Sequence, residues 1–460
     1  MKVLMLGWEF PPYISGGLGT ACYGLTRGLD SAGVKVDFVL PVSLPQDAGD
    51  HVSFKTPANL TGKTGKAKGK TDWAFRDVTM HVLPAFLQPY ATPEGFAETM
   101  KTLGQVGFSG EFAGLGLPVG AFPVGESSGP TPPMGKAVGY DGDLMGQVHR
   151  YASLAVGLAQ DEDFDVIHAH DWMTYPAGLA VAALSGRPLV VHIHSTEFDR
   201  SGENINQQVY DIERAGMHGA DRVICVSYLT RGIALSRYGV NPEKVEVVYN
   251  AVDMPSGRTV GTKTIACDEK IVLFLGRVTM QKGPEYFLQA AKKVLEKFKK
   301  VRFVIAGSGD LISQSVSLAA ELRIGKYVAF TGFLRGDDVG RIFRMADLYV
   351  MPSVSEPFGI APLEAISHNV PVIISKQSGV SEVLTHVLKV DFWDTDDMAN
   401  KIVAVLRHPP LRRVLREQGQ IELRKLSWRD SARKCKKIYK ELTSEKKRKA
   451  GKKRPARRKH

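Results

Sequence analysis

Two carboxylates lie eight positions apart in the segment SEPFGIAPLE, at Glu356 and Glu364. Proline is favoured at the first position of an α-helix, so Pro357 predicts that a helix begins there. Three amides would then have no partner inside the helix and would lie at its positive end: those of Phe358, Gly359 and Ile360. Such amides bind phosphate or sugar oxygens. The segment therefore predicts a ligand-binding helix start, and an ordinary turn with solvated acids is the alternative.

A second set of charged residues lies in the loop GRVTMQKG, where Arg277 and Lys282 stand five positions apart. A guanidinium grips two phosphate oxygens and an ammonium adds a point charge, so the pair suits a diphosphate. A solvated basic loop is the alternative. Near the start of the chain, a turn at Gly16 and Gly17 would bring backbone amides to the same diphosphate from the opposite side. The turn lacks the spacing GxGxxG, which argues against a nicotinamide dinucleotide site.

Four histidines lie in two predicted strand ends, HAHDW and HIH. Alternate strand positions point to one side, and no cysteine or nearby carboxylate cluster completes a metal-ligand set, so we expect no metal. Asp171 and His194 come last on their strands and are expected to face a cleft, where they would contact a substrate. His168 and His192 are expected to be core residues.

Strands and helices alternate along most of the chain and must position these residues. In the first half, we expect strands at 3–6, 34–40, 165–168, 189–194, 222–226 and 245–248. In the second half, we expect strands at 270–275, 302–306, 327–330, 348–350 and 372–374, and a helix at 284–297. Such alternation predicts parallel sheets with helices on both faces.

The chain is long enough for two cores, and the stretch 253–269, rich in Pro, Gly and Thr, predicts a linker between them. We therefore expect two doubly wound domains, 1–255 and 256–427, which face each other across a cleft at the carboxyl ends of their strands. Residues 43–145 are less regular. A helix at 428–445 is expected to cross back to the first domain.

The composition is that of a soluble globular protein, with 43% hydrophobic and 23% charged residues and no apolar run long enough for a membrane span. The opening lacks the features of a signal peptide and the four cysteines are widely spaced, so we expect a cytoplasmic protein without disulfides. The net charge is +12, but residues 446–460 hold ten Lys or Arg and no acid. This basic tail is predicted to be disordered, either for solubility or to contact an anionic surface.

Together, the motifs EFPP…GGLG, HAHDW, VHIH, GRVTMQKG and SEPFGIAPLE resemble the retaining GT-B glycosyltransferases of the glycogen and starch synthase type, and they occur in the family order. The resemblance covers most of residues 1–425. It implies a nucleotide-sugar donor whose diphosphate is held by Arg277, Lys282 and the Gly16-Gly17 turn, without metal or other cofactor. Glu364 would bind the ribose.

The resemblance also implies that Glu356, with the amides of Phe358 and Gly359, holds the donor sugar and stabilises positive charge at its anomeric carbon. His194 would lie close to that sugar, with Asp171 nearby. The departing phosphate would serve as the base, so no side chain is assigned as nucleophile. Family members often carry Lys two residues before the glycine pair, where this chain has Ile14, and this leaves the donor open.

The function predicted first is transfer of glucose from ADP-glucose or UDP-glucose to the non-reducing end of an α-1,4-glucan. A second possibility keeps the reaction class but uses a lipid, a small sugar or a polysaccharide precursor as acceptor. A third is a non-catalytic scaffold that binds carbohydrate or nucleic acid. The presence of Arg277, Lys282, Glu356 and Glu364 argues against the third, because a scaffold has no need of a donor site.

Overall fold

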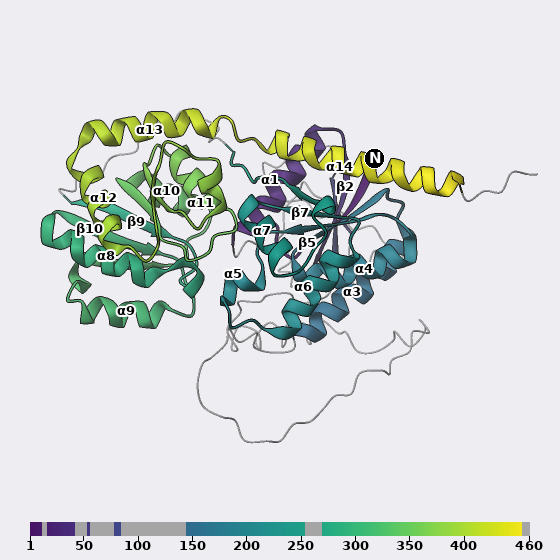
Figure 1. The fold of residues 1–460 in the computed structure, drawn as a ribbon, viewed down its shortest axis with the longest axis horizontal. Helices are drawn as coiled ribbons and strands as arrows, with labels where there is room; N and C mark the ends of the chain where they lie inside the picture. Colours follow the sequence, from purple (N-terminus) through teal and green to yellow (C-terminus); the bar gives the residue numbers. More distant parts are fainter. Residues whose placement is uncertain (12–15, 42–52, 56–77, 84–143, 254–268, 453–460) are drawn as a thin grey trace, which may run out of the picture.

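The computed structural model describes residues 1–11, 16–41, 53–55, 78–83, 144–253 and 269–452. It contains two parallel β-sheets, each with helices on both faces (Figure 1). One sheet precedes residues 254–268 in the chain and the other follows them. The predicted pair of doubly wound domains is therefore confirmed. In the described part of the chain, no helix is both long and apolar enough to span a bilayer.

The first sheet has eight strands in the order β3-β4-β2-β1-β5-β6-β7-β8. The strands are β1 (Lys2–Leu6), β2 (Lys35–Pro41), β3 (Ser53–Lys55), β4 (Val78–Leu83), β5 (Val166–His170), β6 (Leu189–Ile193), β7 (Arg222–Cys225) and β8 (Val245–Val247). β3 and β4 lie in the region 43–145, which the sequence had suggested to be irregular. β3 has only three residues, and β4 mixes Thr and His with apolar residues, so neither strand gives a strong sequence pattern.

Successive side chains of β1 point to opposite faces of this sheet. Val3 and Met5 pack on the side of α1 (Gly17–Ser31), whereas Leu4 and Leu6 pack on the other side. That other face is covered by α3 (Leu144–Asp161), α4 (Tyr175–Ser185) and α6 (Gln207–Gly219). Most positions of the central strands are apolar, because both faces of the sheet are buried.

The second sheet has six strands in the order β11-β10-β9-β12-β13-β14. They are β9 (Lys270–Leu275), β10 (Val301–Ala306), β11 (Val328–Gly332), β12 (Leu348–Met351), β13 (Val372–Ser375) and β14 (Leu388–Val390). Its helices are α8 (Pro284–Lys297), α9 (Ile312–Glu321), α10 (Asp337–Met345), α11 (Ile360–Ser367), α12 (Thr395–Arg407) and α13 (Pro409–Leu423). The strand order reverses between β9 and β12, and loops at such a switch point form ligand sites.

After α13, the chain returns to the first domain through α14 (Trp428–Lys452), which packs on α1 (Figure 1). The close approach depends on two glycines of α1. A Cβ on Gly24 would lie 2.1 Å from the Trp428 ring, and one on Gly28 would lie 2.5 Å from the Trp428 carbonyl oxygen. The predicted crossing helix is thus confirmed. However, the helix continues through residues 446–452, which the sequence had assigned to a disordered tail; residues 453–460 lie outside the described chain.

The two domains share one cluster of buried side chains, which runs from the α1 face of the first sheet to α11 of the second. Polar contacts join them as well. Ser227 donates a hydrogen bond of 2.6 Å to the carbonyl oxygen of Pro357. The Glu382 carboxylate accepts from the amides of Tyr228 and Leu229, at 2.9 and 2.7 Å. An acid of one domain therefore caps the start of α7 (Tyr228–Ser236) in the other.

Candidate functional site

The basic loop follows β9 directly and closes with the short turn η4 (Met280–Lys282) before α8. Its path depends on a close approach between the ends of β9 and β10. A Cβ on Gly307, whose φ is 145°, would lie 1.9 Å from the carbonyl oxygen of Gly276, so no side chain fits there. Arg277 is partly buried, and its guanidinium lies 3.4 Å from the side-chain oxygen of the buried Gln281.

Lys282 and Glu356 meet across the switch point of the second sheet. The Lys282 ammonium lies 2.5 Å from Glu356 Oε2, and the Ser353 hydroxyl donates to the same oxygen at 3.1 Å. Glu356 is only 6% exposed. A buried carboxylate needs a paired cation, so the two charged residues that the sequence placed in separate motifs form one unit.

The segment around Gly359 differs from the predicted helix start. Helix α11 begins at Ile360 rather than at Pro357, and Gly359 precedes it with a φ of 97°. Proline does occupy the first turn of this helix, but it is Pro362. The Pro357 and Phe358 carbonyls instead accept hydrogen bonds from other segments. The first-turn amides of α11, from Ile360 onward, still have no partner inside the helix and lie at its positive end.

Glu364 lies on α11 and lines a pocket of about 310 Å³. Its neighbours there come from α10 and the end of α11, and include Arg344 and His368. Burial raises the pKa of the Glu364 carboxyl to about 7. A carboxylate that titrates near neutrality in a pocket is a good acceptor for a ligand hydroxyl, and such groups gather at functional sites.

In the first domain, Gly16 caps α1, which begins at Gly17. Among the first-turn amides of this helix, that of Gly19 is already used, because it donates to Glu9 Oε2 at 3.0 Å. A Cβ on Gly17 would meet nothing within 4 Å, so the turn is open on that side. Glu9 is buried, and the sequence analysis had assigned it no role. Its position just beyond the carboxyl end of β1 is the sequence feature that could have identified Glu9 as a site residue.

Asp171 and His194 are held together by the backbone. Asp171 Oδ1 accepts hydrogen bonds from the amides of His194, at 2.7 Å, and Ser195, at 3.3 Å. Asp171 has a φ of 59°, which is unusual for a residue with a side chain and marks a constrained position. Burial raises its pKa to about 7. The carboxylate thus fixes the loop that carries His194.

The four histidines of β5 and β6 form a buried stack. His170 Nδ1 lies 2.9 Å from His194 Nε2, and His168 Nδ1 lies 2.6 Å from the Tyr439 hydroxyl of α14. Among the buried ring nitrogens that the structure describes, four have no hydrogen-bond partner: His168 Nε2, His170 Nε2 and both of His192. Burial lowers the pKa of His168 and of His194 to about 3, so the stack is neutral at ordinary pH.

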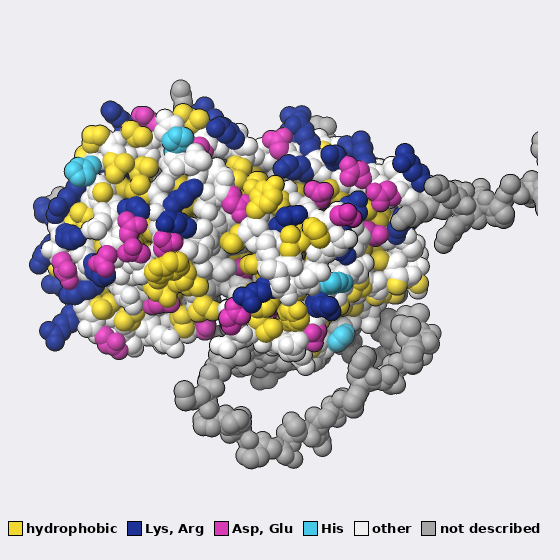
Figure 2. Space-filling model, in the orientation of Figure 1, with side chains coloured by type: hydrophobic (Ala, Val, Ile, Leu, Met, Phe, Trp, Pro, Cys, Tyr) yellow, Lys and Arg dark blue, Asp and Glu magenta, His cyan; other side chains and the backbone are white. Residues whose placement is uncertain are grey.

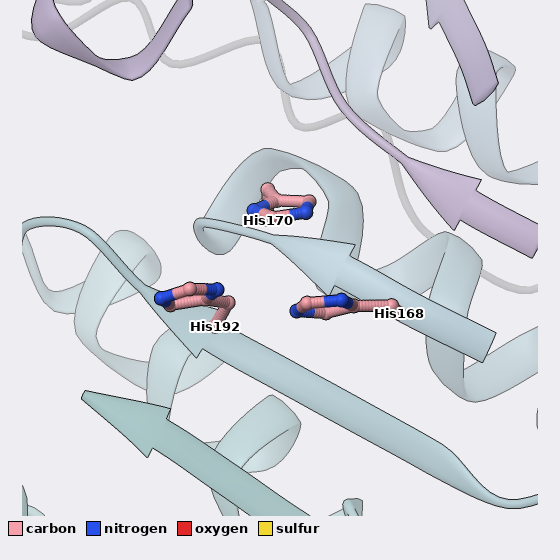
Figure 3. A group of neighbouring side chains, drawn as sticks. All are labelled: His168, His170 and His192. Atoms are coloured by element: carbon pink, nitrogen blue, oxygen red, sulfur yellow. The ribbon is translucent and has the colours of Figure 1, made fainter. Parts of the chain in front are cut away.

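Nitrogens of His168, His170 and His192 lie within 4.8 Å of one another, which raises the question of a metal ion. The lone pair of an imidazole nitrogen lies in the plane of the ring. Figure 3 shows the His170 ring at a different level from the other two, and it stacks on His168 with centroids 4.3 Å apart and 29° between the planes. Stacked rings direct their lone pairs past one another, so this arrangement does not suit tetrahedral coordination.

The loops of the two domains meet beside the Lys282–Glu356 pair. Ser355 donates a hydrogen bond of 2.5 Å to Asp199 Oδ1 in α5 (Glu197–Ser201), which follows His194 closely in the chain. A Cβ on Gly202 would lie 3.9 Å from the Met280 methyl. The contacts bring the segment after His194 to the basic loop and to Glu356. Asp199 and Ser355 were missed by the sequence analysis, since no local pattern marks a contact 156 residues apart.

Comparison with known families divides the chain into three parts. Residues 2–96 match the starch synthase catalytic domain, residues 131–254 match glycosyltransferase family 4, and residues 261–422 match glycosyl transferases group 1.

The Ile14 position and most of the region 43–145 lie outside the described residues.

Several curated relatives are similar in sequence. An uncharacterized glycosyltransferase of Methanocaldococcus jannaschii is 28% identical over 461 residues, which cover 96% of this chain and 98% of the relative. The D-inositol 3-phosphate glycosyltransferase of a Mycobacterium species is 29% identical, over 54% of this chain and 60% of its own length. A galactosyltransferase of Escherichia coli, named for the acceptor alpha-D-GlcNAc-diphosphoundecaprenol, is 27% identical over 54% of this chain and 68% of its own length.

Solved structures share the fold. Sucrose-phosphate synthase from Thermosynechococcus elongatus superposes with a TM-score of 0.67 at 18% identity, over 96% of this chain and 99% of its own. The Anabaena protein HepE, in complex with UDP and glucose, superposes with a TM-score of 0.64 at 16% identity, over 96% and 100% of the two chains.

Proposed function

We propose that this chain, a glycosyltransferase with the GT-B fold, transfers glucose from a nucleoside-diphosphate glucose to the non-reducing end of an α-1,4-glucan, with retention of the anomeric configuration. The observation that carries the proposal is the buried Lys282–Glu356 pair at the switch point of the second sheet. It joins a phosphate-binding cation to a carboxylate suited to a sugar.

Arg277 and Lys282 supply the positive charge that a diphosphate leaving group requires, so no metal ion is invoked. Fixed charges directed at developing negative charge are usually the largest contribution to catalysis. The Gly16-Gly17 turn would add amides from the opposite wall. Glu364, in its pocket, would accept a hydrogen bond from a ribose hydroxyl.

Glu356 has a second role in this scheme. Its Oε2 is held by Lys282 and Ser353, and no described residue donates to its Oε1. The free oxygen would accept from a hydroxyl of the donor sugar and stabilise the positive charge at the anomeric carbon. The bond from that carbon to the diphosphate breaks as the acceptor oxygen bonds to it, and the leaving phosphate takes the acceptor proton.

Support for a glucan acceptor comes from the match of residues 2–96 to the starch synthase catalytic domain. A specific observation also favours a second acceptor class. Relatives named for inositol phosphate and lipid-diphosphate acceptors support transfer to a small or lipid-linked molecule.

The deciding experiment measures the release of nucleoside diphosphate from ADP-, UDP- and GDP-sugars, with and without glycogen and without added metal. We expect release from ADP-glucose or UDP-glucose that rises with glycogen. Donor turnover that does not change with glycogen but rises with a polyprenyl-diphosphate sugar or with inositol phosphate would favour the second acceptor class. Absence of turnover with every donor would leave the non-catalytic scaffold as the better interpretation.

A further inference from the structure

The positive charge of the chain is concentrated in its last helix and in the residues that follow. Residues 428–460 contain sixteen Lys and Arg and three Asp and Glu, a net charge of +13, whereas the whole chain carries +12. The rest of the molecule therefore has a net charge of −1. A charge so localised indicates an interaction surface more strongly than a basic protein as a whole would.

Helix α14 divides into two faces. One face packs on the first domain through apolar side chains, all buried: Trp428, Ala432, Cys435, Ile438, Tyr439 and Leu442. The opposite face carries a row of exposed basic residues: Arg429, Arg433, Lys437, Lys440 and Arg448. Intervals of three, four and eight residues keep this basic row on one side of the helix. At 1.5 Å per residue, the row is about 28 Å long.

The three acids of α14 do not cancel the basic row. Asp430 lies 2.8 Å from Arg433, and Glu441 lies 3.8 Å from Lys437. Glu445 pairs with Arg222 on β7 instead, at 3.3 Å. Arg429, Lys440 and Arg448 form no ion pair with any residue that the structure describes. Figure 2 shows Lys and Arg side chains gathered along the upper edge of the first domain, where Figure 1 places α14.

We propose that the basic row of α14 binds an anionic lipid surface. The row is straight and faces outward, as contact with a flat sheet of charge requires. Clusters of basic residues on a helix whose other face is occupied bind anionic lipid headgroups in this way. The row carries no apolar side chain that could insert into a bilayer, so the attachment is electrostatic and sensitive to salt.

A nucleic acid is the other polyanion that a basic row could bind. Proteins that bind single strands interleave aromatic side chains with the basic ones, and this face of α14 has none. The second acceptor class named under the proposed function adds a further reason, since a transferase that uses a lipid-linked acceptor must work at a membrane. The choice of a lipid surface as the partner rests on that second acceptor class. That the basic row binds a polyanion of some kind does not depend on it.

The test is cosedimentation of the full chain with vesicles of phosphatidylcholine alone or with 30 mol% phosphatidylglycerol, a composition of about one anionic lipid in three. The test variant replaces Arg429, Arg433, Lys437, Lys440 and Arg448 by Gln. The control variant removes the same charge from the second domain, by Gln at five exposed positions: Lys297, Lys299, Lys300, Lys326 and Arg413. Circular dichroism verifies that both variants are folded.

We expect binding to the anionic vesicles alone, a loss of at least about tenfold in affinity for the test variant, and little change for the control. Raising NaCl from 0.1 to 0.5 M should also release the protein. Equal binding to neutral vesicles, or equal losses in both variants, would overturn the proposal. So would tight binding to a DNA duplex without binding to vesicles. Donor turnover measured in solution tests the proposed function separately, because it needs no vesicle.

Discussion

The Lys282 ammonium lies 2.5 Å from Glu356 Oε2, so the cation expected to hold a leaving phosphate is paired with the carboxylate expected to face the sugar. The Lys282 side chain is 20% exposed and that of Glu356 is 9% exposed. Each residue therefore sets the position and the charge balance of the other. Donor binding would bring a second anion to Lys282, so the pair links occupancy of the phosphate site to the position of Glu356.

Lys282→Ala and Glu356→Ala should each lower kcat by about 10² to 10³, because each removes a fixed charge from a site shielded from water. Steady-state kinetics checks this, and thermal unfolding shows whether the fold survives. Lys376→Ala is the control, since it breaks an exposed ion pair with Asp391 of similar length, 2.7 Å, and should change little. Turnover near that of the unaltered protein in both site variants would contradict the assignment.

Donor affinity should depend on the ionisation of Glu364, whose pKa is raised to about 7. Below that pH the carboxyl gains a proton and becomes a weaker acceptor for a donor hydroxyl. The KM for the donor should therefore rise as the pH falls from 8 to 6. Glu364→Gln should raise the KM at pH 8 and flatten its pH dependence, whereas Glu321→Gln at an exposed position should leave the profile unchanged.

His170 should act as a positioning residue for His194. Their rings are joined by Nδ1 and Nε2 at 2.9 Å and both are neutral, so one must donate and the other accept. This bond couples the tautomers of the two rings, because one nitrogen of the contact carries the proton and the other accepts it, and His194 Nδ1 takes no part in it. His170→Phe should lower kcat with little change in the donor KM, and His170→Gln should restore part of the loss.

Nitrogen NMR of His194 would report the tautomer directly. The unaltered protein should show a single neutral tautomer, and His170→Phe should show a mixture. His149→Phe, at an exposed position on α3, serves as the control. Unchanged tautomer and kcat in His170→Phe would show that the contact is structural alone.

The histidine stack should make the protein sensitive to acid. The pKa of His168 and of His194 is about 3 in the folded state, below the ordinary value of 6.5. Between these values the unfolded chain takes up protons that the folded protein does not, so the free energy of unfolding falls as pH decreases below 6.5. Each such histidine contributes at most about 1.4 kcal/mol per pH unit.

Urea unfolding at pH 7, 6 and 5 measures this slope. His192→Val removes a buried imidazole whose two nitrogens have no described partner, so the variant should be no less stable at pH 7 and should lose less stability at pH 5. An identical slope for the variant and the unaltered protein would mean that the pKa of His192 is not lowered in the fold.

Replacement of glycine by alanine should change the stability of the protein in opposite directions at two positions, one at the contact of α1 with α14 and one at an open site on α3. Gly24→Ala places a methyl 2.1 Å from Trp428 and should destabilise the protein by about 1 to 3 kcal/mol. Gly157→Ala, within α3, meets nothing within 4 Å and should stabilise by roughly 0.5 to 1 kcal/mol. Thermal unfolding compares the two; equal shifts in Tm would contradict the close approach of the helices.

Local patterns in the sequence predicted much of the fold. Alternation of apolar strands and amphipathic helices predicted both sheets, since strands buried on two faces leave a clear signal. Helix α8 was predicted with the bounds it has, 284–297, because Pro284 and the preceding Gly283 mark its start. The edge of the first sheet formed by β3 and β4 was missed, because β3 has only three residues and both strands lie far from the regular alternation of strands and helices in the sequence. The start of α11 was misplaced by three residues, because a proline in the first helical turn, Pro362, follows the earlier one.

The sequence by itself determined the fold class and the residue types of the site, because spacing along a strand or helix is a local property of the chain. It also located the basic tail at residues 446–460 and the carboxylates. Only the tertiary structure decided their partners: Lys282 with Glu356, Glu9 with the Gly19 amide, Asp199 with Ser355, and His170 with His194. Contacts between distant segments depend on how the two sheets and their loops pack, and on which buried charges can be paired, and no local pattern encodes either.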